Sequence, residues 1–237
     1  MATELIRPLL FIASDRREAQ PWVSYWDSSR TVDLPVHWAR VGEWQGRGVI
    51  AVANGVGSAR AAAAVQAART VTDSFCGICS IGTGGALDAS LAIGDVVVAA
   101  SVTDGYHNWV AANPIGPVAR SGLVRTSLRI AKTAEEKRNL SATGAILVEM
   151  ESAAIAQCAL ELAVPFYCVR AVSDLVTEAF FIDFESYLMA DGTFNVPRLV
   201  MHALAHPVKG FSELLRLQRR TALAAENLGQ YLANCKF

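Results

Sequence analysis

Two carboxylates stand two residues apart in Glu149-Met150-Glu151, where a predicted strand meets a predicted helix. On a strand end both carboxylates would point the same way, with Met150 on the opposite face. A carboxylate offers only hydrogen-bond acceptors, so it suits a pair of neighbouring hydroxyl groups such as the diol of ribose. A structural alternative stays open, because a carboxylate at a helix N-terminus also stabilises the helix and Glu151 stands at that start.

A second acidic group, Asp174, follows Ser173 directly after the apolar run 166–172. An aspartate at a strand end beside a cleft can act as a general acid, since partial burial keeps its proton available. The alternative is an aspartate that caps the next turn.

The segment Gly82-Thr83-Gly84-Gly85 can bring backbone amides close to an anion or a sugar, because glycine permits unusual backbone angles and close approach. An ordinary glycine turn is the alternative. The earlier segment Asn54-Gly-Val-Gly57 lacks the third glycine of a dinucleotide-binding fingerprint, since Arg60 occupies that position.

Alternating strands and helices must position these residues. Apolar runs predict strands at 8–13, 75–82, 96–102, 121–127, 145–148 and 166–172, the second broken by the glycines at 82–85. The segments 36–41 and 44–53 predict a strand pair that turns at Gly42-Glu43. Helices are predicted at 59–71 with Ser58 as N-cap, at 151–162, and over 196–232, divided by Pro207 and Gly210. The irregular stretch 104–120 is a candidate pocket loop or lid.

Strand-loop-helix units with continuously apolar strands predict a three-layer α/β/α sandwich around a central, mostly parallel (mixed) sheet. Ligands of such sheets bind on the loops beyond the strand ends, where the residues above are placed. The 237 residues contain no visible linker, so we expect a single domain, 1–237.

The overall composition excludes several classes of protein. A net charge of −1 does not indicate a general nucleic-acid binder. No apolar run approaches the roughly 20 residues of a spanning helix, and no targeting segment is visible, so we expect no membrane span and a cytoplasmic location. Hydrophobic residues make up 52% and charged residues 18%, which leaves apolar surface to cover, either in an oligomer or in a deep apolar cleft. Of the two we expect a homodimer or larger homo-oligomer.

The five cysteines do not indicate a metal site. Cys76 and Cys79 have the spacing of half a zinc site, but no second pair of cysteines or histidines completes it. An odd count mostly inside apolar runs indicates reduced core thiols. We expect no metal and no cofactor.

Three segments, in order, resemble signatures of the nucleoside phosphorylase and nucleosidase superfamily, which includes the methylthioadenosine/S-adenosylhomocysteine nucleosidases. The first is Asn54-Gly-Val-Gly-Ser-Ala-Arg-Ala-Ala62. The second is Ser80-Ile-Gly-Thr-Gly-Gly-Ala-Leu-Asp88 with Ile93-Gly-Asp-Val-Val-Val98. The third is Val148-Glu-Met-Glu-Ser-Ala-Ala154 with Val164-Pro-Phe166 and Arg170-Ala-Val-Ser-Asp174. The tail from Ala190 to Arg220 is similar in rhythm to a bacterial branch, the hopanoid-associated phosphorylases.

The resemblance implies a role for each matching residue. Glu151 would bind the ribose hydroxyls, Met150 would pack on the sugar, and Asp174 would protonate the purine as it leaves. Thr83 would face the nucleophile. Glu18 is our choice for the N-terminal carboxylate that positions water, with the register uncertain within Asp15–Glu18. Gly84, Ser173 and Glu149 complete the predicted substrate-binding residues.

The resemblance leaves the nucleophile open. Phosphorylases of this superfamily carry a phosphate-binding arginine where this chain has Ser80, which favours water over phosphate. Arg16 or Arg17 is an alternative source of phosphate-binding charge, and a solvated helix start is the structural alternative for both.

The predicted function is therefore cleavage of the N-glycosidic bond of a purine, adenine-type nucleoside by hydrolysis. Phosphorolysis, including release of adenine from a lipid-linked (hopanoid) nucleoside, is one alternative. A non-catalytic nucleoside-binding protein is another. The expected partner is a small-molecule nucleoside, with phosphate as a second ligand if the reaction is phosphorolytic.

Overall fold

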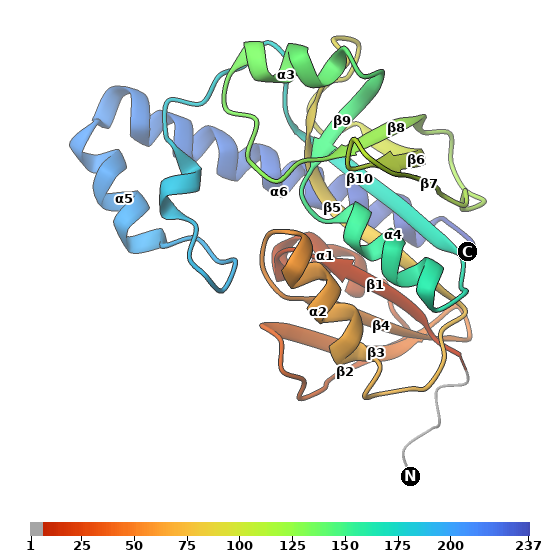
Figure 1. Ribbon diagram of the computed structural model, residues 1–237. Coiled ribbons are helices and arrows are strands. Elements are labelled where there is room, and N and C mark those ends of the chain that lie inside the picture. The colour runs from red at the N-terminus through yellow and green to blue at the C-terminus, as the bar shows by residue number, and fades with distance from the viewer. Residues whose placement is uncertain (1–6) are drawn as a thin grey trace.

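The computed structural model describes residues 7–237, which form a mixed sheet with helices on both faces (Figure 1). The strands are β1 Leu9–Ala13, β2 Ser28–Thr31, β3 Trp38–Trp44, β4 Arg47–Ala53, β5 Gly77–Ala86, β6 Val96–Thr103, β7 Asn108–Val110, β8 Arg120–Thr126, β9 Ala145–Glu149 and β10 Phe166–Asp174. The helices are α1 Arg16–Val23, α2 Ser58–Ala68, α3 Ala134–Ser141, α4 Ser152–Glu161, α5 Val196–Ala205 and α6 Ser212–Ala233, with a 3₁₀ turn at Phe184–Tyr187 and a π turn at Pro207–Phe211.

The sheet has a parallel centre. Strands β4, β1, β5 and β10 lie side by side and parallel, and antiparallel β3 and β2 extend one edge. On the other side β10 also pairs with β6, β6 with β8, β8 with β9, and β9 with β5. Strands β5, β10, β6, β8 and β9 therefore close into a ring. The α/β/α prediction with a mixed sheet is confirmed, and the ring is a feature that the sequence did not predict.

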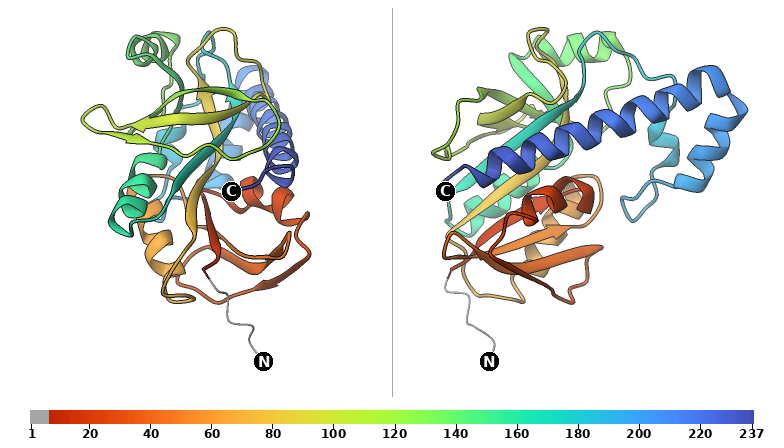
Figure 2. Two further views of the ribbon diagram at one scale, coloured as in Figure 1. Left: turned by 90° about the vertical axis from the view of Figure 1, so that its right-hand side faces the viewer. Right: turned by 180° about the vertical axis from the view of Figure 1, so that it is seen from behind.

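Two helix layers cover the sheet, as the side view in Figure 2 shows. Along β1 the side chains alternate in the way that strand geometry requires. Leu9 and Phe11 share a core with Trp22 of α1 and with the end of α6, whereas Leu10 and Ile12 share a core with α2 and α4. Because β1 is buried on both faces, its sequence is a continuous apolar run.

Three local predictions were wrong. The β3–β4 turn lies at Gln45 and Gly46, both with positive φ, while Gly42 lies inside β3, where a Cβ would meet the Ser28 carbonyl oxygen at 1.9 Å. Ser58 does not cap α2, because its hydroxyl donates instead to the Met150 carbonyl and Gly57 takes the N-cap position.

The glycines at 82–85 do not break the strand, which is the third of these corrections. Strand β5 continues through them to Ala86, paired with β10 on one side and with β9 at its end. The absence of side chains lets neighbouring groups approach the strand. An added Cβ on Gly84 would lie 2.5 Å from the Leu147 side chain.

The C-terminal helices form as predicted, divided where Pro207 and Gly210 fall, and α5 projects from the body of the molecule (Figure 1). Helix α3 (AEEKRNLS) was missed because it has too few apolar residues to show helical periodicity, and α1, which contains Pro21, was predicted only as the alternative of a solvated helix start at Arg16 and Arg17. The expected lid 104–120 contains β7, which pairs with β6. In the part of the chain that the structure describes, none of the helices has the length and apolarity to cross a membrane.

Candidate active site

The polar residues singled out in the sequence gather where the parallel strands β1, β4, β5 and β10 end. Each of these strands carries one of the segments in question at its carboxyl end: 14–18 and 54–57 follow β1 and β4, whereas 82–85 and 173–174 lie within the last residues of β5 and β10. The end of β9 lies alongside, because Val148 pairs with Gly85. Open α/β sheets bind ligands at this edge.

Arg170 is the centre of a buried network beneath this edge. Its Nη2 lies 2.7 Å from Oε2 of Glu149 and 2.6 Å from the Ser80 hydroxyl oxygen. Burial, the largest single effect, would lower the pKa of Arg170, but the neighbouring charges of Glu149, Glu151 and Glu18 act together in the opposite direction and the pKa is raised above its usual range. No role was predicted for Arg170. The signal was a lone charge inside the apolar run of β10, because a fully buried arginine needs a partner.

Glu149 was predicted to bind substrate, but its carboxylate oxygens already accept hydrogen bonds from groups of the protein. Its Oε2 accepts hydrogen bonds from the backbone amides of Glu151 and Ser152, and its Oε1 accepts from the Thr126 hydroxyl. Glu149 therefore caps α4 and neutralises Arg170. Glu151 occupies the N-cap position of α4, as its structural alternative requires, but its side chain makes no capping hydrogen bond.

Glu151 instead points across to the start of α2. Its Oε1 accepts a hydrogen bond of 2.8 Å from the Gly57 amide, and its Oε2 lies 3.8 Å from Nη1 of Arg170. Burial, and then the negative charge of Glu149, raises the pKa of the Glu151 carboxyl to about 7, although Arg170 acts in the opposite direction. A buried carboxylate with few donors has acceptor capacity left for a ligand.

Glu18 and Thr83 form a second cluster on the same edge. Oε1 of Glu18 accepts from the Thr83 amide at 2.8 Å and from the Thr83 hydroxyl at 2.9 Å. Oε2 accepts from the amides of Ser14 and Asp15 and from the Ser14 hydroxyl. Gly82 makes this possible, since an added Cβ would lie 2.9 Å from Oε2 of Glu18. The structure thus brings together Glu18 and Thr83, the two residues expected beside the nucleophile.

Asp174 lies against the end of β5. An added Cβ on Gly85 would be 2.8 Å from its Oδ1, and its Oδ2 accepts a 2.9 Å hydrogen bond from the Ser173 hydroxyl. The same hydroxyl lies 3.2 Å from the Gly84 carbonyl oxygen, so it can donate to either group. Oδ1 of Asp174 also forms an ion pair with Lys137 of α3, a residue that sequence analysis missed.

The remaining predicted residues lie at the margin. Arg16 and Arg17 are exposed, and the Arg17 guanidinium binds both carboxylate oxygens of Asp15, at 2.9 and 2.8 Å. Met150 is half-buried beside Glu151. Ser80, which stands where phosphorylases carry their phosphate-binding arginine, is fully buried in the Arg170 network. This position therefore lies beneath the carboxyl edge of the sheet.

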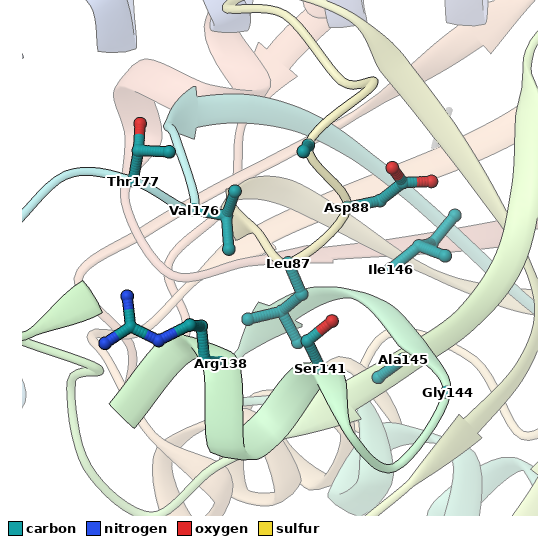
Figure 3. Close-up of a pocket in the computed structure, with 10 residues that line it drawn as sticks. Leu87, Asp88, Arg138, Ser141, Gly144, Ala145, Ile146, Val176 and Thr177 are labelled. Atoms are coloured by element: carbon teal, nitrogen blue, oxygen red, sulfur yellow. The ribbon is translucent and has the colours of Figure 1, made fainter. Parts of the chain in front are cut away.

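A separate hollow of about 520 Å³ opens between α3 and the end of β5 (Figure 3). Leu87, Arg138, Ile146 and Thr177 are among its lining residues, and none of the predicted site residues lines it. It adjoins the carboxylate site through α3, because Arg138 follows Lys137. The carboxylates and hydroxyls that could do chemistry lie at the strand ends and not in this hollow, so we place the candidate site at the strand ends.

Comparison with known proteins decides the family. The sequence model described as "Phosphorylase superfamily" matches residues 36–123 and 115–191, more than half of the chain. The chain belongs to the phosphorylase superfamily. The resemblance inferred from the three sequence segments is thereby confirmed.

Within the phosphorylase superfamily the chain is similar to nucleosidases. It is 28% identical over 203 residues to a 5′-methylthioadenosine/S-adenosylhomocysteine nucleosidase of Colwellia psychrerythraea, covering 69% of this chain and 81% of that one. A Staphylococcus saprophyticus protein of the same name is 30% identical over 47% of this chain and 62% of its own length. The Neisseria meningitidis nucleosidase crystallised with methylthio-immucillin-A shares the fold, with a TM-score of 0.71, 20% identity, and coverage of 96% of this chain and 97% of that one.

Proposed function

We propose that this protein hydrolyses the N-glycosidic bond of an adenine-type purine nucleoside. The observation that carries the proposal is the arrangement along the end of β5. Glu18 binds Thr83, the Ser173 hydroxyl reaches the Gly84 carbonyl, and Asp174 lies against Gly85. An acceptor for water and a donor for the leaving base thus lie along one short stretch of strand.

The reaction requires charge stabilisation at both ends of the bond that breaks. As the bond between C1′ and the purine nitrogen lengthens, positive charge develops on the sugar and the electron pair moves to the base. Asp174 would give its proton to the base, and Glu151 would accept hydrogen bonds from the ribose hydroxyls beside the developing cation.

Water would then add to C1′. Glu18 would bind this water in exchange for the Thr83 hydroxyl, which lies 2.9 Å away and is free to rotate. The carboxylate would take the water's proton, so that the products are a free sugar and a protonated base. Met150 would contact the sugar, as its place between Glu149 and Glu151 suggests.

Three observations favour water over phosphate as the nucleophile. Ser80 stands where the phosphorylases have an arginine, Arg17 is engaged by Asp15, and the similar proteins carry the name nucleosidase. Arg16 and Arg17 remain the candidates for a phosphate site.

A panel of nucleosides tests the proposal. Adenosine, inosine, 5′-methylthioadenosine, S-adenosylhomocysteine and an adenosine with a 5′-alkyl chain would each be incubated with and without phosphate, and the products separated by chromatography. We expect free adenine and free sugar without phosphate. A sugar 1-phosphate formed only with phosphate would overturn hydrolysis, and binding without cleavage would indicate a binding protein.

We further infer that the protein forms a homodimer or larger homo-oligomer and acts in the cytoplasm. Support for self-association comes from large apolar side chains that are exposed along the C-terminal helices: Val196, Val200, Met201, Leu204, Val208, Phe211 and Leu215. The location rests on the sequence alone.

A further inference from the structure

Lys137 is a charged side chain for which the proposed reaction has so far given no role. It lies on α3 and is 0% exposed, which is rare for a lysine without a function or a partner. Its Nζ contacts Oδ1 of Asp174 and donates a 2.7 Å hydrogen bond to the Leu175 carbonyl oxygen. The Phe180 ring lies 5.1 Å from the same ammonium.

These contacts fix α3 over the end of β10. The Phe180 amide donates to the Lys132 carbonyl oxygen at 2.9 Å, so the segment after Asp174 is attached both to α3, through Lys137, and to the residue just before its N-cap. The cap of α3 is complete, because Thr133 and Glu136 exchange side-chain and backbone hydrogen bonds. The ammonium is therefore delivered to Asp174 by a well-defined helix rather than by a loose surface side chain.

We propose that Lys137 is a positioning residue for Asp174. Its ammonium stabilises the negative carboxylate that forms on Asp174 once the side chain has given its proton to the leaving purine. The inference rests on the proposed function. A carboxylate and a purine nitrogen both offer lone pairs, so base binding requires a proton between Oδ2 and the purine. When that proton moves to the purine with the breaking of the glycosidic bond, negative charge appears on Asp174, next to the ammonium.

The two carboxylate oxygens have different partners, which suits this role. Oδ1 faces Lys137, whereas Oδ2 faces the Ser173 hydroxyl. The hydroxyl can turn to the Gly84 carbonyl oxygen when Oδ2 carries the proton, and return to Oδ2 when the proton has left. Lys137 fixes the orientation in which Oδ2 is available to the base.

Leaving-group dependence tests the role of Lys137. A purine needs a proton to leave, but p-nitrophenolate does not, so the two substrates 5′-methylthioadenosine and p-nitrophenyl β-D-ribofuranoside separate the functions. For K137M we expect kcat on the nucleoside to fall about 10- to 100-fold, the worth of one charge-assisted hydrogen bond, and kcat on the nitrophenyl riboside to change less than about threefold. KM for both substrates should stay within about threefold of wild type.

The ratio of the two kcat values does not depend on how much of the variant is folded, so the test survives partial unfolding. K137Q repeats the measurement if K137M is insoluble. K132M, at a half-exposed lysine just before α3, is the matched control and should leave the ratio unchanged.

Two results would overturn the inference: a kcat of K137M within twofold of wild type on the nucleoside, or an equal fall on both substrates, which indicates a structural role. If wild-type protein cleaves neither substrate, the proposed function itself is wrong, which is a different outcome.

Discussion

Asp174 is the side chain on which the chemistry of the leaving group depends. In D174N the amide keeps the shape and can still accept the Ser173 hydrogen bond, but it has no acidic proton to give. We expect kcat on a purine nucleoside to fall about 10²- to 10⁴-fold, the usual contribution of general acid catalysis. Binding, measured by calorimetry with a non-hydrolysed analogue, should persist. A kcat above half of the wild-type value would remove Asp174 from this role.

Glu151 is the residue that should recognise the ribose diol. In E151Q an NH₂ group that can only donate replaces one carboxylate oxygen, so the side chain cannot accept from both hydroxyls and ribosides should lose about 10- to 100-fold in kcat/KM. The 2′-deoxyribosides should lose much less, because they lack one of the hydroxyls. Steady-state kinetics with adenosine and 2′-deoxyadenosine compares the two. Equal losses on both substrates would indicate a structural role for Glu151.

The raised pKa of Glu151 also predicts how stability depends on pH. The folded protein retains this proton up to about pH 7, whereas an unfolded chain loses it near 4.5. The stabilising contribution is therefore complete below pH 4.5 and is lost as pH rises through 7. Urea unfolding at pH 5 to 8 should show wild type losing stability relative to E151Q. The control E135Q, at an exposed glutamate on α3, should follow wild type, and a pH-independent difference for E151Q would contradict the prediction.

At the level of elements, strands were more predictable than helices, and the reason is burial. β1 is apolar throughout, and residues 166–172 of β10 are apolar apart from Arg170, because both faces of these strands are covered, so composition alone located them. α3 carries almost no apolar signal, since one lysine supplies its main buried contact. Lys137 was therefore missed together with the helix that positions it.

The glycines of β5 were predicted to end the strand, but they lie within it. The prediction treated 82–85 as a turn, but hydrogen bonding to β10 and β9 keeps the strand continuous. Gly82 has a φ of +148°, and an added Cβ would lie 2.5 Å from Nη1 of Arg170. These glycines are present because side chains of other elements press against the strand.

Substitution of Gly82 separates crowding from backbone strain. Gly46 also has positive φ, with no atom within 4 Å of an added Cβ. We expect G46A to lower the free energy of unfolding by about 1 kcal/mol through backbone strain alone. G82A should cost about 1 kcal/mol more and should also reduce kcat, because the new methyl group displaces Glu18 and Arg170. Chemical denaturation and kinetics measure both, and equal losses for the two variants would show that crowding is unimportant.

For the whole molecule, the sequence predicted the layered architecture. It also singled out most of the carboxylates that lie at the candidate site, because the sequence signatures fall at the ends of strands that are neighbours in the sheet. It did not predict that β5, β10, β6, β8 and β9 close into a ring, since the pairing of β10 with β6 joins segments about 70 residues apart. It also did not reveal that Glu149 forms an ion pair with Arg170, whereas Glu151 retains free hydrogen-bond acceptor capacity. Two glutamates of equal type and nearly equal position differ only in what surrounds them after folding.

Self-association is the prediction that belongs to the molecule as a whole. Val196, Val200 and Leu204 recur every fourth position along α5 and so lie on one face of this projecting helix, and Val208 and Phe211 are exposed in the turn that follows. Burial of each such side chain contributes about 1.5–3 kcal/mol, which favours covering this face with a second copy. Light scattering after gel filtration should give a mass of at least twice the 25.4 kDa of the chain. L204D should shift the mass toward one chain, whereas V118D, at a fully exposed valine outside these helices, should not. A wild-type mass of 25.4 kDa at about 50 μM would contradict the prediction, and an L204D variant with unchanged mass would move the interface elsewhere.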